Sequence, residues 1–240
     1  MEQTLLMKQK FITRAFVTFL IFITAQSVFA QRTEGKLGGW YSYNWHTSSG
    51  DSPFGLMGDF QYRGYGVASD FQQFILRGGV SYTPKESGLT LVAGYSYFNS
   101  GELGDSNPQI YEHRLYQDAL FKQKLWDRVF IGHRIRVEER FVENQDFRTR
   151  LRYMISARVP VNQKTLDKNA LFFVAQNEVF VNGQKDIGNG RSVTLFDRNW
   201  LAGGVGYSFS DNLRLELIYM RESTESLNKG QLWLTLFHTL

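Results

Sequence analysis

Hydrophobic and polar residues alternate with a period of two along most of the chain after residue 36. In "FILRGGVSY", Phe74, Leu76 and Val80 fall on one face of an extended chain, whereas Arg77 and Ser81 fall on the other. Successive side chains of a β-strand point to opposite faces, so this period predicts strands with one apolar and one polar face. Alternating segments lie near 36–46, 54–63, 72–83, 88–99, 111–122, 128–142, 147–159, 170–182, 198–209, 213–222 and 230–240. The pattern therefore predicts an all-β protein.

The stretch "RIRVEERFVENQDFRTRLRY", residues 134–153, shows the alternation most clearly. Arginine recurs at alternate positions, and the residues between are mostly Ile, Val, Phe, Leu and Tyr. We expect a hairpin centred on Asn144, in which residues at equal distance from the turn face each other across the two strands. The expected pairs are Phe141 with Phe147, Glu138 with Arg150, and Arg136 with Arg152. One face of the hairpin is then apolar and the other is rich in arginine.

The length and spacing of the segments favour a membrane barrel. Each segment has about ten residues, the length that a tilted strand needs to cross a bilayer. Short connections ("PKESG", "SDN") alternate with long ones ("NSGELGDSNPQI", "NGQKDIGNGRSVT"), and aromatic residues gather near segment ends. Both features are typical of outer-membrane barrels. We therefore predict an antiparallel transmembrane β-barrel, although a soluble barrel or sandwich with its apolar face inside has the same period.

The number of strands does not follow directly from the segments. The alternation gives eleven of them, whereas single-chain bacterial barrels have even numbers of strands. Either one segment near the N-terminus is not a strand, or one segment contains two. We therefore expect ten or twelve strands, and we prefer twelve.

The first thirty residues have the composition of a secretory signal peptide. Lys8, Lys10 and Arg14 precede the apolar run "AFVTFLIFITA", and small residues at Val28 and Ala30 complete a cleavage site. The run is shorter than the roughly 20 apolar residues of a membrane-spanning helix. We therefore predict a signal peptide at residues 1–30 and a barrel domain at residues 31–240. Together they place the mature protein in the outer membrane of a Gram-negative bacterium.

Composition supports this class and excludes others. The net charge is +4, and it falls to +2 without residues 1–30, which contain three basic residues and one acidic residue. The basic balance is therefore no argument for a nucleic-acid partner. Cysteine is absent, so disulfides and thiolate metal sites are excluded, and no motif indicates a metal or a cofactor. Aromatic residues make up 15% of the chain, with 22 Gly and only 4 Pro, as expected of a barrel with aromatic girdles.

Several motifs resemble a known family. They are "EHRLYQ" at 112–117, "GHRIRVEERF" at 132–141, "RTRLRY" at 148–153, "NEVFVN" at 177–182, "FDRNW…GVGYSFSDNLRLELIYM" at 196–220, and Trp40. The chain resembles the outer-membrane barrel family known as domain of unknown function 2490. The resemblance covers nearly all of the mature chain and implies the same fold and location, but no activity. The family pattern has a second arginine after Asn199, where this chain has Trp200.

The inward arginines are the candidate functional residues. The two strands of the 134–153 hairpin carry seven inward Arg and one inward Glu, so further counter-ions must come from other strands, a ligand or water. Glu178 and Glu216 are the carboxylates best placed by the pattern. One interpretation is a hydrogen-bonded plug that fills the lumen; the other is a path for anions, since arginine binds carboxylate and phosphate bidentately. The candidates are Arg134, Arg136, Glu138, Arg140, Arg148, Arg150, Arg152, Arg158, Glu178, Arg214 and Glu216.

The sequence thus predicts passage or binding of small anionic solutes through an arginine-lined lumen, with outer-membrane lipid as the surroundings. The alternative is a structural or interaction barrel whose lumen is closed by salt bridges. A third possibility is a lipid or ester hydrolase at the membrane rim. His113, near Glu112 and Asp118, is its only plausible general base, and no serine has a distinctive context, so no catalytic residue is assigned.

Overall fold

Each of the eleven alternating segments forms a strand in the computed structural model, close to its expected bounds. The structure describes residues 32–33, 36–47, 52–85, 87–104 and 108–240, and the predicted signal peptide lies outside these ranges. A two-residue strand, β1 (Arg32–Thr33), precedes the others. They are β2 (Gly38–His46), β3 (Phe54–Gly64), β4 (Phe71–Tyr82), β5 (Leu89–Gly101), β6 (Gln109–Leu125), β7 (Val129–Val142), β8 (Arg148–Pro160), β9 (Leu171–Asn182), β10 (Phe196–Ser210), β11 (Leu213–Ser223) and β12 (Leu227–Thr239).

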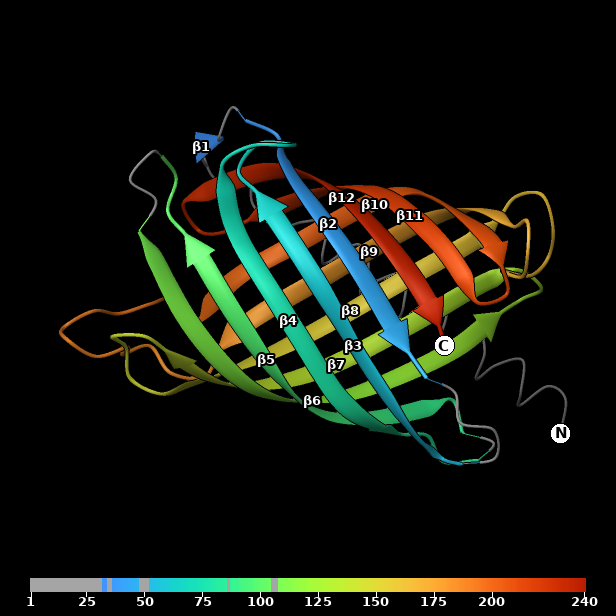
Figure 1. The fold of residues 1–240 in the computed structure, drawn as a ribbon, viewed down its shortest axis with the longest axis horizontal. Helices are drawn as coiled ribbons and strands as arrows, with labels where there is room; N and C mark the ends of the chain where they lie inside the picture. Colours follow the sequence, from blue (N-terminus) through green and yellow to red (C-terminus); the bar gives the residue numbers. More distant parts are fainter. Residues whose placement is uncertain (1–31, 34–35, 48–51, 86, 105–107) are drawn as a thin grey trace, which may run out of the picture. The chain divides into compact units, whose positions relative to one another are not determined.

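Strands β2 to β12 follow one another in up-and-down order and form a closed barrel wall (Figure 1). Consecutive wall strands pair antiparallel, but β12 closes the barrel against β2 in parallel, with Trp233 beside Trp40. The expectation of ten or twelve strands is therefore wrong, because the wall has eleven. In up-and-down order, the first and last of an odd number of strands run in the same direction. A parallel pair still satisfies the backbone hydrogen bonds of both edges.

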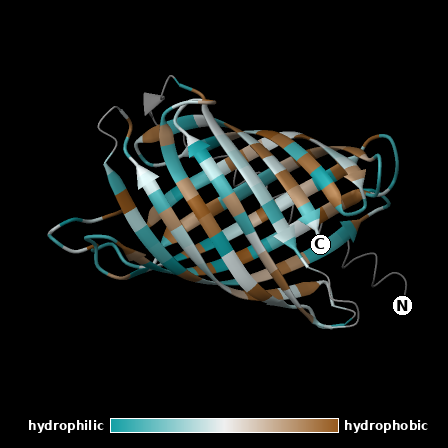
Figure 2. Ribbon diagram, in the orientation of Figure 1, coloured by the Kyte–Doolittle hydropathy of each residue, from teal (hydrophilic) through white to brown (hydrophobic). Residues whose placement is uncertain are grey.

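The apolar face of the wall points outward and the charged face points into the barrel. Leu91 and Val137 expose 44% and 39% of their surface, whereas Arg136 and Arg152 expose 5% and 4%. Hydrophobic positions recur along neighbouring strands, and the loops beyond the strand ends are largely hydrophilic (Figure 2). A fold with its apolar face inside, which the period alone allows, is therefore wrong for this chain.

The 134–153 hairpin has the predicted register. Glu138 lies opposite Arg150 and Arg136 opposite Arg152, and the rings of Phe141 and Phe147 are 5.2 Å apart beyond them. Asn144 has a φ of 57°, a left-handed conformation that asparagine tolerates better than most residues. The turn chemistry and the period therefore fix the same register.

The connections lie at two ends of the barrel. Segments 83–88, 126–128 and 211–212 join strands at one end, which we call the short-turn end. Segments 102–108 and 183–195 lie at the opposite, long-loop end. The connection 161–170 is an exception, because it is long yet belongs to the short-turn end. Its Leu166 packs against buried residues of the interior, and its carbonyl oxygen accepts a hydrogen bond from Ser208 Oγ at 2.8 Å. No helix in the described ranges is long and apolar enough to cross a membrane.

Candidate functional site

One buried carboxylate connects three arginines near the middle of the lumen. Glu138 on β7 is only 1% exposed, accepts a hydrogen bond from Arg150 Nε at 2.7 Å and lies 2.6 Å from Arg150 Nη2. It also accepts from Arg152 Nη1 at 2.9 Å and lies 3.4 Å from Arg114 Nη1. Charge-assisted hydrogen bonds of this kind hold both partners in a fixed geometry. Glu138 is therefore the centre of the network.

The two carboxylates expected from the pattern each bind two arginines. Glu178 accepts from Arg134 Nη2 at 2.7 Å and from Arg152 Nε at 2.8 Å. Glu216 accepts from Arg158 Nε and Nη2 at 2.7 and 3.1 Å, and Arg214 Nε lies 3.3 Å from it. Because β9 and β11 provide these acids, the network extends beyond the two hairpin strands.

Other carboxylates of the network were missed at the level of sequence. Asp118 binds Arg136 through two contacts of 2.6 Å, and Glu112 binds both Arg114 and Arg140 at 2.6 Å. Elsewhere, Asp59 pairs with Arg77 at 2.7 Å, Asp197 with Arg150 at 2.7 Å, and Glu222 with Arg198 at 2.6 Å. The signal was present, since Glu112, Arg114 and Asp118 occupy alternate positions of one strand in "EHRLYQD". The period of two therefore marks Glu112 and Asp118 as inward residues of the same strand as Arg114.

Aromatic side chains pack against the ion pairs inside the barrel. The rings of Trp40 and Trp200 are 5.1 Å apart, and Phe180 lies 4.6 Å from Trp200. The guanidinium carbon of Arg63 is 3.7 Å from the ring centre of Trp40, and that of Arg152 is 4.3 Å from Phe180. Cations over ring faces are attracted by the ring quadrupole. The interior is therefore an ion-paired layer joined to an aromatic cluster.

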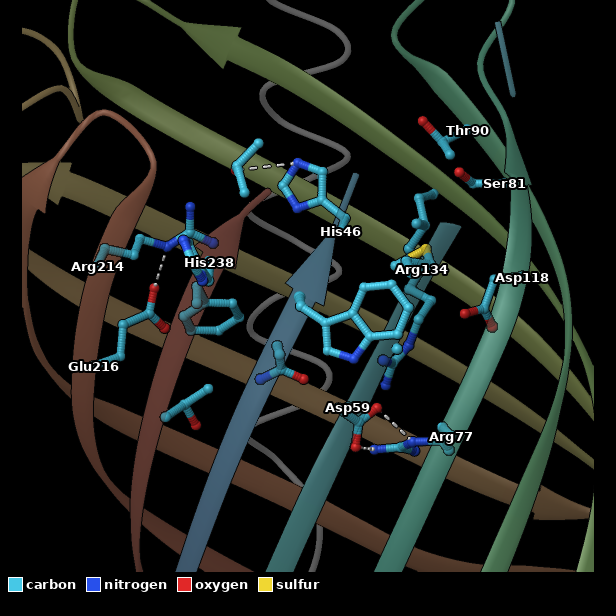
Figure 3. Close-up of a pocket in the computed structure, with 18 of the residues that line it drawn as sticks. His46, Asp59, Arg77, Ser81, Thr90, Asp118, Arg134, Arg214, Glu216 and His238 are labelled. Atoms are coloured by element: carbon cyan, nitrogen blue, oxygen red, sulfur yellow. Dashed lines mark hydrogen bonds and ion pairs between the residues drawn. The ribbon is translucent and has the colours of Figure 1, made fainter. Parts of the chain in front are cut away.

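A cavity of about 600 Å³ lies between this layer and the short-turn end. It reaches the rim, where Pro53, Asp211 and Thr239 line it. In Figure 3, Arg77 contacts Asp59 on one side of the cavity and Arg214 contacts Glu216 on another. The charged lining comprises Arg63, Arg77, Lys122, Arg134, Arg136, Arg152, Arg158, Arg214, Asp59, Asp118, Glu178, Asp211 and Glu216. Eight cationic side chains against five acidic ones leave a surplus of three positive charges.

Several donors in the lining are buried without a hydrogen-bond partner within the described part of the chain. They are Arg63 Nε, Arg134 Nε, Arg136 Nη1 and Trp200 Nε1. Buried donors are normally satisfied by protein or by ordered water, so each unsatisfied one calls for an explanation. These four side chains come from three strands, β3, β7 and β10, and meet at the cavity. One acceptor of the lining, Glu178 Oε2, is also unsatisfied, so the unpaired donors outnumber the unpaired carboxylate oxygens.

Two of the histidines, His113 and His133, lie on the outer face of the wall. His113 lies on the outer face, where its Nδ1 atom is 2.5 Å from the hydroxyl of Tyr95. Glu112 and Asp118 point inward, because each is an odd number of positions from His113 along the strand. The interpretation of His113 as a base assisted by these acids is therefore wrong. His133 also lies on the outer face, with its Nδ1 2.9 Å from the Tyr153 hydroxyl.

One comparison with known proteins identifies a family for the chain. A family model described as "Protein of unknown function (DUF2490)" matches residues 37–232. The chain belongs to this family. The matched range begins just before β2 and ends within β12, so it covers nearly the whole barrel wall. A search of curated proteins found no significant match to the chain.

Trp200 of this DUF2490 member lies inside the barrel. Trp200 is 5% exposed and packs between Trp40 and Phe180, where the resemblance predicts an arginine. Its ring also faces the guanidinium groups of Arg63 and Arg152, at 5.5 and 5.8 Å. The indole extends the aromatic cluster, and it adds no charge to a lumen that is already rich in cations.

All eleven residues predicted for the lumen lie on the inner face. Nine of them belong to one of two networks. The first network contains Glu112, Glu138 and Glu178, and the second contains Glu216. Arg136 pairs separately with Asp118. Arg148 differs, because it is buried but makes no hydrogen bond or ion pair within the described ranges.

Proposed function

We propose that this DUF2490 member is an outer-membrane barrel that binds a small anion in the basic cavity of its lumen. The observation that carries the proposal is the surplus of three positive charges around a cavity of about 600 Å³. Cavities of roughly 300–1,000 Å³ are typical of small-molecule sites. The unpaired guanidinium donors of Arg63, Arg134 and Arg136 are suited to a carboxylate or phosphate group.

The outer face supports the membrane location. Ile135, Leu151 and Leu217 expose 50%, 48% and 47% of their surface, and similar residues recur on the neighbouring strands. Soluble monomers rarely expose a continuous apolar surface of this extent. Tyrosine and histidine pairs, such as Tyr95 with His113, lie on the same face and suit the aromatic girdles of a membrane barrel. In such barrels the short turns face the periplasm, and the cavity would open there.

The closed interior favours binding over free passage. Glu138, Arg152 and Phe180 expose 1%, 4% and 1% of their surface near the middle of the lumen. An ion crossing the barrel would have to separate ion pairs that hold one another through several hydrogen bonds each. We therefore propose a binding site that is closed at one end by the ion-paired layer, rather than an open pore.

A structural barrel with a salt-bridged lumen is the second candidate. The observation in its favour is the network centred on Glu138, which gives three of the inward arginines a protein partner. Buried ion pairs can fix a fold without serving a ligand. The two candidates differ in one property, because only the first requires that the cavity attract soluble anions.

A single cysteine provides the test, since the chain has none. In a Ser210→Cys variant, the thiol lies at the cavity, beside Ser208, the cross-strand partner of Arg214. We expect the anionic sulfonatoethyl methanethiosulfonate to react faster than the cationic trimethylammonioethyl reagent. Adding Arg214→Gln should lower the ratio of these rates about 3- to 10-fold, as expected from Coulomb interaction at this range. Because both reagents attack the same thiolate, their ratio cancels changes in its reactivity.

Arg221→Gln is the matched control, because Arg221 lies on the same strand but is exposed on the outer face. It should leave the ratio unchanged. A ratio that does not respond to Arg214→Gln would favour the structural barrel. In planar bilayers the wild-type protein should show no steady conductance, and frequent anion-selective steps would contradict the blind cavity.

A further inference from the structure

Three arginines form a row at the long-loop end of the lumen. Arg114 on β6 lies directly opposite Arg140 on β7, which in turn lies opposite Arg148 on β8. Residues paired in this way have Cβ atoms roughly 5 Å apart. The three side chains expose only 5%, 8% and 7% of their surface, so the row is shielded from bulk water.

The carboxylates near this row make ion pairs with two of the arginines, whereas Glu112 and Asp197 act on the third, Arg148, only from a longer range. Glu112 accepts two hydrogen bonds from Arg114 and two from Arg140, at 2.6 to 3.1 Å. Glu138 is 3.4 Å from Arg114 but is held mainly by Arg150 and Arg152. Arg148 has no hydrogen bond or ion pair within the described residues, and its Nε is buried without a partner.

A buried guanidinium without a counter-ion is costly, and next to another arginine it is also repelled. We propose that the long-loop end holds a second anion site, in which an oxyanion such as phosphate or sulfate bridges Arg148 and Arg140. Guanidinium groups present parallel N–H donors that match two oxygens of such an ion. A tetrahedral oxyanion could accept from both side chains and supply the missing negative charge.

This site is distinct from the proposed cavity, because none of the three arginines of the row is among the residues that line it. The row faces the lumen, so its ligand is a free oxyanion that enters between the loops rather than the phosphate of a surrounding lipid. Arg148 lies close to the connection 183–195 of the long-loop end. The backbone N–H of its neighbour Thr149 donates to Gln184 Oε1 of that connection at 2.6 Å.

Thermal unfolding in detergent micelles free of phosphate provides the test. Inorganic phosphate should raise the Tm of the wild-type protein relative to chloride at equal ionic strength. The rise is expected to reach about 3–6 °C at ten times the Kd and to grow with the logarithm of the phosphate concentration above it. Arg148→Gln should remove most of this rise while leaving the Tm without phosphate unchanged or higher, because it removes an uncompensated charge. An Arg148→Lys variant keeps the positive charge but lacks the parallel N–H donors of the guanidinium group. Phosphate should therefore raise its Tm less than that of the wild type.

Arg214→Gln tests whether phosphate acts through the cavity instead. This variant should retain the greater part of the phosphate-dependent rise in Tm. An equal rise in wild type and Arg148→Gln, or no rise in the wild type, would overturn the second site. So would a rise that appears only in vesicles containing a phosphorylated glycolipid, because it would assign the anion to lipid. Failure of the second site would leave the cavity untouched, since the cysteine assay at residue 210 does not involve Arg148.

Discussion

Glu138→Gln is expected to destabilise the folded barrel by about 3–5 kcal/mol, the cost of breaking a buried ion pair by removing one partner. Among the residues that the structure describes, Glu138 is the one carboxylate that contacts three arginines, Arg114, Arg150 and Arg152. The substitution preserves the size of the side chain but removes its charge. The three guanidinium groups then repel one another without their shared partner. The free energy of unfolding in urea, measured in vesicles by tryptophan fluorescence, gives the effect.

Glu139→Gln is a close control for this substitution. Glu139 is the next residue on β7, but it points outward and makes no ion pair within the described residues. Its substitution should change the free energy of unfolding by no more than about 0.5 kcal/mol, as is usual for surface positions. A loss below about 1 kcal/mol for Glu138→Gln would show that water replaces the missing carboxylate, and that the layer is hydrated rather than dry.

Ile135→Arg is expected to make folding into lipid vesicles less favourable by about 2–4 kcal/mol. This is the cost of an arginine at the middle of the lipid face of a membrane barrel. Ile135 lies near the centre of β7, between Ala119 and Tyr153 of the adjoining strands, and is 50% exposed. An arginine there would place its charge in hydrocarbon if the wall crosses a bilayer. The yield of folded barrel in vesicles, measured by resistance to protease, is an independent readout.

The matched control is Leu195→Arg, because Leu195 is 52% exposed but lies in the connection before β10. It should fold as well as wild type, since a loop residue reaches water. If the protein were soluble, both leucine and isoleucine would already be in water and both variants would be tolerated equally. Equal behaviour of Ile135→Arg and Leu195→Arg would therefore argue against the membrane location.

The strands and the register of the hairpin could be predicted from sequence because they depend on local properties. The period of two marks each strand, and Asn144 marks a turn whose backbone is left-handed. The roles of Glu178 and Glu216 were also within reach, since both lie at inward positions of their strands. The pairing of Arg136 with Asp118 was not expected, because Asp118 lies on β6 and the pattern within one strand does not show which neighbouring side chain reaches it.

The parallel closure of the eleven strands and the place of the cavity depend on contacts that no local pattern contains. Trp40 and Trp233 meet across the closing pair although they are far apart in sequence, and the direction of that pair decides whether an odd number is allowed. The cavity depends on how side chains from most strands share the interior. Arg148 likewise lacks an ion pair because no carboxylate among the described residues lies within contact distance of it. Only the arrangement of the strands in space determines such distances.

The amino-acid sequence by itself determined that the chain forms long strands with one oily and one charged face, and which residues share each face. It left open which face is inside, since alternation is the same for a barrel of either kind. The tertiary structure decided that the arginines face inward, that eleven strands close through a parallel pair, and, apart from Glu138 with Arg150, which carboxylates pair with which arginines. The reason is that periodicity is a property of one strand, whereas closure and charge pairing are properties of the whole wall.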